Sequence, residues 1–147
     1  MIGLVDRALA LNPSFARGWY LSAGLMLRAG DPDAAIERLE TALRLSPRAR
    51  VGQMSTFLGV AHFLKRRFDE ALRFLLRGIQ ERPTAPTSHR WLAACYAHLG
   101  RLAEAREIIQ RVRTLTPAVV SHMPLVDKPD HLELFRSGLR LAAGEKT

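Results

Sequence analysis

Apolar residues recur along most of the chain at intervals of three and four, the spacing of an amphipathic helix. Trp19 and Met26 mark one face of such a helix, and Gly30 follows it as a C-cap. Residues 31–33 make a turn and offer an N-cap to a second helix, which runs to Ser46. No stretch alternates apolar and polar residues as a half-buried strand does. The pattern predicts an all-α protein.

This two-helix pattern occurs three times. Pro47, Pro83 and Pro117 each close a helical stretch, at separations of 36 and 34 residues. Five further columns keep these separations: Ala23, Gly59 and Ala93; Met26, His62 and Tyr96; Ala35, Ala71 and Ala105; Leu39, Leu75 and Ile109; Ala42, Gly78 and Val112. The units are 16–49, 52–85 and 86–119, with residues 50 and 51 inserted between the first two. Units of this size must stack, because none can bury its own apolar face.

The column chemistry predicts how the helices pack. Alanine or glycine at a helix crossing lets two backbones approach closely, and leucine or isoleucine one turn later fills the space between them. The expected fold is a right-handed superhelix of helical hairpins. Residues 1–15 keep the register of a second helix and form a half repeat. Residues 120–147 are expected to be a linker and a capping helix from His131 to Gly144, so that 1–147 is one domain.

The spacing resembles that of the tetratricopeptide repeat, which pairs an early Trp, a small residue and a Tyr with a later Ala, a large apolar residue, Ala and Pro. In the first unit this pattern is met by Trp19, Ala23, Met26, Ala35, Leu39, Ala42 and Pro47. The third unit has His89 at the Trp position, and the middle unit departs most, with Ser55, His62 and Gly78. The resemblance implies a superhelix that binds other proteins.

A narrower resemblance covers nearly the whole chain. Residues 8–13 (ALALNP), 91–97 (WLAACYA) and 133–141 (ELFRSGLRL) look like the C-terminal repeat region of class III adenylate/guanylate cyclases of soil alphaproteobacteria. This resemblance implies a bacterial signalling protein whose cyclase activity would belong to a domain absent from this chain.

Composition and charge narrow the choice of partner. The chain is 48% hydrophobic and 24% charged, which is ordinary for a globular protein. Its formal net charge of +8 raises nucleic acid or an anionic lipid surface as partners. Of the 22 basic residues 19 are Arg, scattered through the helical pattern, which does not favour nucleic acid. A basic nucleic-acid-binding or regulatory domain remains the alternative.

The sequence also bears on compartment and membrane association. Cys95 is the one cysteine, which excludes an intramolecular disulfide. No apolar run approaches the roughly 20 residues that span a bilayer. The first residues lack the basic and apolar regions of a signal peptide. We expect a cytoplasmic protein with no membrane segment.

Motifs for catalysis are missing. The glycines form neither G-x-G-x-x-G nor a phosphate-binding loop, and the metal-binding aspartates of a cyclase have no counterpart. Cys95 has the character of a small buried side chain. The other candidates are explained by packing, helix capping or solvated helix ends: His62, His89, His98, His122, His131, Asp31, Asp33, Asp69, Glu70, Arg48, Arg50, Arg66 and Arg67. We expect no enzyme activity, no cofactor and no metal.

The candidate binding surface is the concave groove lined by the first helix of each unit. Helical projection places the following residues there: Arg17, Tyr20, Leu27, Arg28, Gln53, Thr56, Val60, Phe63, Leu64, Thr87, Arg90, Ala94 and His98. Leu27, Phe63 and Leu64 suggest an apolar floor beside arginines, suited to a helix or extended peptide with apolar anchors and acidic flanks. Alternatively, these side chains pack against a neighbouring helix.

Two further expectations concern partners. Some members of the family bind a chaperone's C-terminal carboxylate through a Lys and an Asn one turn apart. The corresponding pairs here are Tyr20/Gly24, Thr56/Val60 and Arg90/Ala94, so that clamp is absent.

At the N-terminal end, the half repeat leaves one side of Ile2, Leu4, Val5, Leu9 and Leu11 without a covering helix. Two such edges are expected to pair about a two-fold axis as a homodimer of a truncated chain. The sequence thus predicts a non-catalytic protein–protein interaction module.

Overall fold

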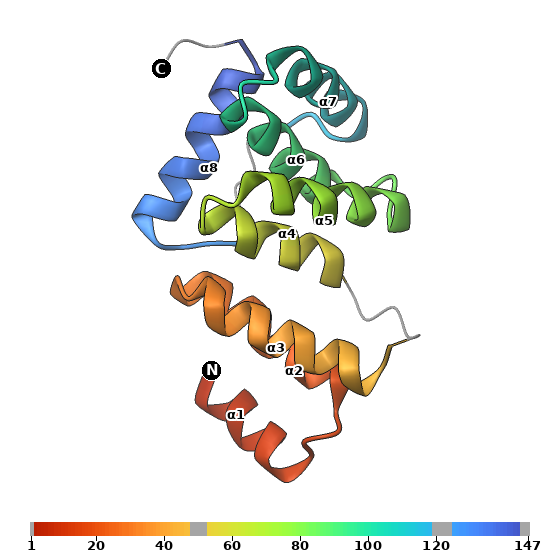
Figure 1. Cartoon of the computed structure of the whole chain (residues 1–147), viewed down its shortest axis with the longest axis vertical. Helices are drawn as coiled ribbons and strands as arrows, with labels where there is room; N and C mark the ends of the chain where they lie inside the picture. The colour runs from red at the N-terminus through yellow and green to blue at the C-terminus, as the bar shows by residue number, and fades with distance from the viewer. Residues whose placement is uncertain (1, 48–52, 119–124, 145–147) are drawn as a thin grey trace.

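The computed structural model describes residues 2–47, 53–118 and 125–144, which form eight α-helices and no strand (Figure 1). The helices in chain order are α1 (Ile2–Leu11), α2 (Ala16–Ala29), α3 (Pro32–Leu45), α4 (Met54–Leu64), α5 (Phe68–Glu81), α6 (Pro86–His98), α7 (Leu102–Leu115) and α8 (Pro129–Ala142). The prediction of an all-α superhelix is confirmed.

The helices pair as the hairpins α2–α3, α4–α5 and α6–α7, which stack along the long axis of the molecule (Figure 1). Small residues stand where the two helices of a hairpin cross. Ala35, Ala71 and Ala105 are fully buried. A Cβ atom added to Gly59 on α4 would lie 2.6 Å from Leu75 Cγ on α5, so this crossing has no room for a larger residue.

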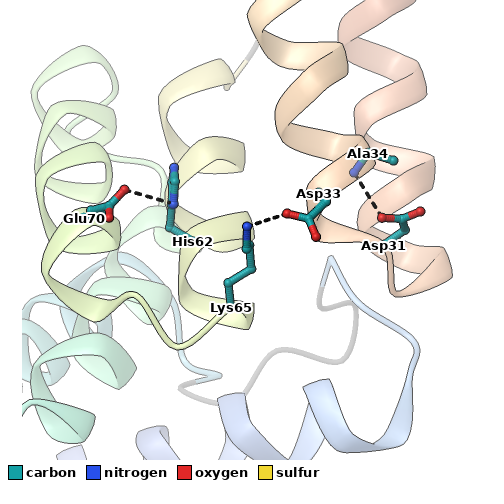
Figure 2. A network of polar contacts seen from close by, with 6 residues as sticks. All are labelled: Asp31, Asp33, Ala34, His62, Lys65 and Glu70. Atoms are coloured by element: carbon teal, nitrogen blue, oxygen red, sulfur yellow. Dashed lines mark hydrogen bonds and ion pairs between the residues drawn. The ribbon is translucent and has the colours of Figure 1, made fainter.

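Each hairpin turns through a residue with a positive φ angle. Gly30 and Gly100 adopt φ values of 84° and 78°. The Gly30 N–H donates to the Leu27 carbonyl oxygen and the Asp31 N–H to that of Met26, which satisfies the end of α2. The Asp31 carboxylate then accepts from the Ala34 N–H at 3.0 Å and caps α3, as the sequence predicts (Figure 2).

Neighbouring hairpins are joined by aromatic and polar contacts between their helices. The rings of Tyr20 on α2 and Phe57 on α4 stack at 4.8 Å. Lys65, at the end of α4, forms an ion pair with Asp33 at the start of α3 (Figure 2). We call the surface made by α2, α4 and α6 the inner face.

The C-terminal helix packs against the last hairpin. It begins at Pro129, two residues before His131, and it packs mainly on α6 and much less on α7. In Figure 1, α8 (blue) runs beside the hairpins and does not continue the stack beyond α7. It therefore packs on the last hairpin from the inner face.

Candidate functional site: the inner face

The residues predicted to line an open groove differ widely in exposure. Arg17 is exposed, and four others are partly exposed: Arg28, Gln53, Thr87 and His98. The remaining eight are buried: Tyr20, Leu27, Thr56, Val60, Phe63, Leu64, Arg90 and Ala94. These eight side chains therefore do not form an exposed groove surface.

Phe63 shows why the expected apolar floor is not exposed. Its ring packs edge-on against Phe68 at 5.2 Å and Trp91 at 5.1 Å, and its exposed fraction is 0%. Helix α4 lies between the first and third hairpins, and every one of its residues is buried. A position off the packing columns of one hairpin is thus filled by the next hairpin, the alternative that the sequence left open.

Helix α8 covers the part of the inner face that belongs to the third hairpin. The Phe135 ring stacks on Trp91 with centroids 4.1 Å apart. A Cβ atom on Gly138 would lie 2.8 Å from Ala94 Cβ, so α8 approaches α6 at a pair of small residues. His98 Nε2 lies 2.7 Å from the Leu134 carbonyl oxygen, where a protonated ring nitrogen donates. The helix is held by an aromatic ring, a close backbone approach and a hydrogen bond.

The residues before α8 reach back to the first hairpin. Val126 is fully buried. Asp127 Oδ1 lies 3.3 Å from Arg28 Nη1, an ion pair in which both side chains are substantially exposed. The Lys128 side chain lies against Gly30, where an added Cβ would be 2.8 Å from its Cδ. Residues 125–142, which we call the C-terminal segment, thus contact the inner face at α6 and at the end of α2.

The signal for this contact was present in the sequence. Gly138 stands inside a helix between Phe135 and Leu139, where glycine costs about 1 kcal/mol relative to alanine. A glycine kept there indicates that another backbone comes close. The sequence could not show which helix that is, since α8 and α6 are separated by the linker.

Two buried titratable groups near this surface, Cys95 and His62, have pKa values shifted by burial. The thiol of Cys95 is buried and donates to the Phe68 carbonyl oxygen at 3.2 Å, and burial raises its pKa to about 12. A thiol in this state is no nucleophile at neutral pH. Burial also lowers the pKa of His62, partly offset by Glu70, whose carboxylate lies 3.4 Å from Nδ1 (Figure 2).

The described ranges exclude Arg48, Arg50 and His122. There, no group of three or more His, Cys, Asp or Glu side chains could hold a metal ion. Within the same ranges, no helix has the length and apolar character needed to cross a bilayer.

Stacked two-helix units with small residues at their crossings define an α-solenoid. The chain belongs to the tetratricopeptide repeat family: models of this family match residues 2–48, 25–86 and 62–118. This fold is typically a non-catalytic scaffold for protein–protein interaction. A search of curated protein sequences found no match.

Several solved structures share the fold. A D159K mutant of MamA is 25% identical with a TM-score of 0.64, over 78% of this chain and 66% of that chain. A crystal structure of MamA is 17% identical with a TM-score of 0.69, over 97% and 85% of the two chains. YrrB, described as a TPR protein with an unusual peptide-binding site, is 19% identical with a TM-score of 0.64, over 95% and 75%.

Proposed function

We propose that residues 1–147 form one non-catalytic module that binds a segment of a partner protein on its inner face. The observation that carries the proposal is the docking of the C-terminal segment. An aromatic anchor, a close approach at Gly138 and an ion pair at Arg28 already hold a helical segment there. These are the features with which a groove recognises a helix. The peptide-binding site described for YrrB, which shares the fold, agrees with this proposal.

The partner would use the part of the inner face that remains accessible. Arg17 is exposed, the Arg28 side chain is 40% exposed, and Gln53 and Thr87 are partly exposed. The ion pair with Asp127 shows that the Arg28 guanidinium binds a carboxylate. An acidic partner segment would compete with Asp127 for this guanidinium, and through it with the C-terminal segment.

The larger context is also a proposal. The runs at 8–13, 91–97 and 133–141 support a position in a bacterial, cytoplasmic signalling protein such as a class III adenylate cyclase. The catalytic domain would then lie outside this chain. We expect the chain alone to form no cyclic nucleotide from ATP or GTP with magnesium or manganese. Product above an empty-vector control would contradict this, and the upstream reading frame of the gene would test the context directly.

Partner binding is tested with charge reversals on two faces. Proteins captured by the chain from its source cells are compared with those captured by Arg17→Glu/Arg28→Glu. The control is Arg106→Glu/Arg113→Glu, which makes the same charge change on exposed residues of α7. We expect a partner retained by the control and lost by the inner-face variant. Equal capture by all three proteins would refute an inner-face site.

We further propose self-association through α1. Leu4 and Leu11, one heptad apart, have exposed fractions of 70% and 83%. Leu9 is buried against α2 and Val5 is partly buried, so the expectation of an uncovered side is wrong for these two side chains. The side chain of Ile2 lies outside the described part of the structure. The two exposed leucines form an apolar edge that a second copy could cover.

A further inference from the structure

The exposed side of α5 carries a hollow that the inner face does not explain. It has a volume of about 490 Å³ and is lined by Arg73, Phe74, Leu76, Arg77 and Gln80. These positions follow one another at one, two, one and three residues along α5, so they share one face of the helix. Leu76 is 40% exposed, an apolar side chain at the surface between two arginines.

The repeats supply an internal comparison for this face. The positions equivalent to Arg73 are Glu37 and Glu107, and those equivalent to Leu76 are Glu40 and Gln110. All of these side chains are exposed, so they occupy the same outward position in their hairpins. At these two positions α3 and α7 carry acidic or amide side chains, and α5 replaces them with a cation and an apolar residue. Stacking does not require this change, because α3 and α7 stack without it.

The arginines of this face are available to a partner. Within the described ranges, Arg73 and Arg77 make no hydrogen bond or ion pair, whereas Arg38 binds Asp6 and Arg101 binds Glu104. Two free guanidinium groups one helical turn apart favour carboxylates as their ligands.

The floor of the hollow is held in place. The Phe74 ring stacks on the buried His62 at 5.3 Å, with ring planes 2° apart. This contact orients the Phe74 ring against α4. Beside it, Leu76 provides apolar surface that a ligand can bury.

We propose that this face of α5 is a second interaction surface, which binds an acidic peptide segment of a partner protein. An apolar side chain of that segment fills the hollow against Phe74 and Leu76, and flanking carboxylates bind Arg73 and Arg77. A nucleic acid or membrane is a poorer fit. Tight binding to phosphate backbones uses roughly 6–10 cationic contacts, and here two cations surround an apolar hollow. This proposal does not rest on binding at the inner face.

The test uses a fluorescent peptide array in which Leu, Ile, Phe or Trp stands between paired glutamates, measured by anisotropy with the full chain. We expect at least one peptide to bind, and Arg73→Glu/Arg77→Glu to weaken it at least about tenfold. Leu76→Gln, which installs the residue of the equivalent position on α7, should weaken it as well without changing charge. The matched control, Arg106→Glu/Arg111→Glu on α7, should bind like the parent.

Three outcomes would overturn the proposal. One is a parent chain that binds none of the peptides. Another is equal weakening in the α7 control, which would indicate general electrostatic attraction. The third is duplex DNA or phosphatidylserine vesicles that bind through Arg73 and Arg77 while the peptides do not. All substituted side chains are exposed, so each variant should fold. Circular dichroism of each variant checks this.

Discussion

Arg66 adopts a backbone conformation that the other two hairpins give to glycine. Its φ angle is 60°, and Gly30 and Gly100 stand at the equivalent positions. A residue with a Cβ atom pays about 1 kcal/mol or more in this left-handed region. The middle hairpin thus carries local strain at its turn.

We expect Arg66→Gly to raise the free energy of unfolding by about 1 kcal/mol, measured by chemical denaturation. The reciprocal control is Gly100→Ala, where an added Cβ would meet nothing within 4 Å. It should destabilise by a similar amount through backbone strain alone. Stabilisation by both changes, or by neither, would contradict this account of the turn.

His62 makes the stability depend on pH. Burial holds its pKa below the ordinary 6.5, with Glu70 opposing and Arg67 and Lys65 adding to the shift. Below about pH 6.5 the unfolded chain takes up a proton that the folded chain resists, so the free energy of unfolding falls on acidification. We expect a lower Tm at pH 5.5 than at pH 7.5. His62→Tyr installs the residue of the equivalent position 96 and should reduce this difference in Tm. If the difference stayed the same, another titratable group would be its source.

Phe63 shows that projecting a single helix does not reveal which of its residues the next hairpin covers. Projection placed it on an open groove because it lies off the columns that pack within its own hairpin. In the structure, Phe68 of its own hairpin and Trp91 of the next hairpin enclose it. A charged residue in its place would be buried without a partner, so Phe63→Asp would report on folding and not on ligand binding.

At the scale of elements, the contact between α8 and α6 depends on Gly138. An added Cβ would lie 2.8 Å from Ala94 Cβ and 3.0 Å from Ala94 Cα, and the latter is a backbone atom that cannot turn away. The packing of α8 on the inner face is therefore sensitive to a single methyl group.

We expect Gly138→Ala to lower the free energy of unfolding by about 1–3 kcal/mol and to speed hydrogen exchange in residues 129–142. In an unconstrained helix the same change would stabilise by up to about 1 kcal/mol. Gly3→Ala on α1, where nothing lies within 4 Å of the new Cβ, is the control and should not destabilise. Stabilisation by Gly138→Ala would show that α8 does not approach α6 this closely.

At the scale of the whole molecule, the superhelix has two unlike ends. The last hairpin has α8 against it, whereas α1 leaves Leu4 and Leu11 exposed. We expect a concentration-dependent dimer in size-exclusion chromatography with light scattering. Leu4→Glu/Leu11→Glu should yield a monomer, and Leu43→Glu/Leu102→Glu, on less exposed leucines of α3 and α7, should not. A parent chain that stays monomeric at high concentration would contradict the proposal.

The hairpins, their turns and the family were predictable from the sequence because each depends on local or periodic features. Ala35, Ala71 and Ala105 recur at fixed separations and are buried at equivalent crossings. Asp31 caps α3 with a hydrogen bond that spans three residues. Such contacts lie within one repeat unit, so the spacing of residue types is enough to predict them.

The occupant of the inner face was decided by the tertiary structure alone. Asp127 meets Arg28 across 99 residues of sequence, and Phe135 meets Trp91 across a linker that breaks the repeat. No periodicity relates these pairs, because the C-terminal segment is not another copy of the unit. Helix α8 lies across α6 and does not continue the stack, because the surface of α6 is the one that fits Phe135 and Gly138. That choice depends on the shape that α2, α4 and α6 make together, which exists only after the hairpins have stacked.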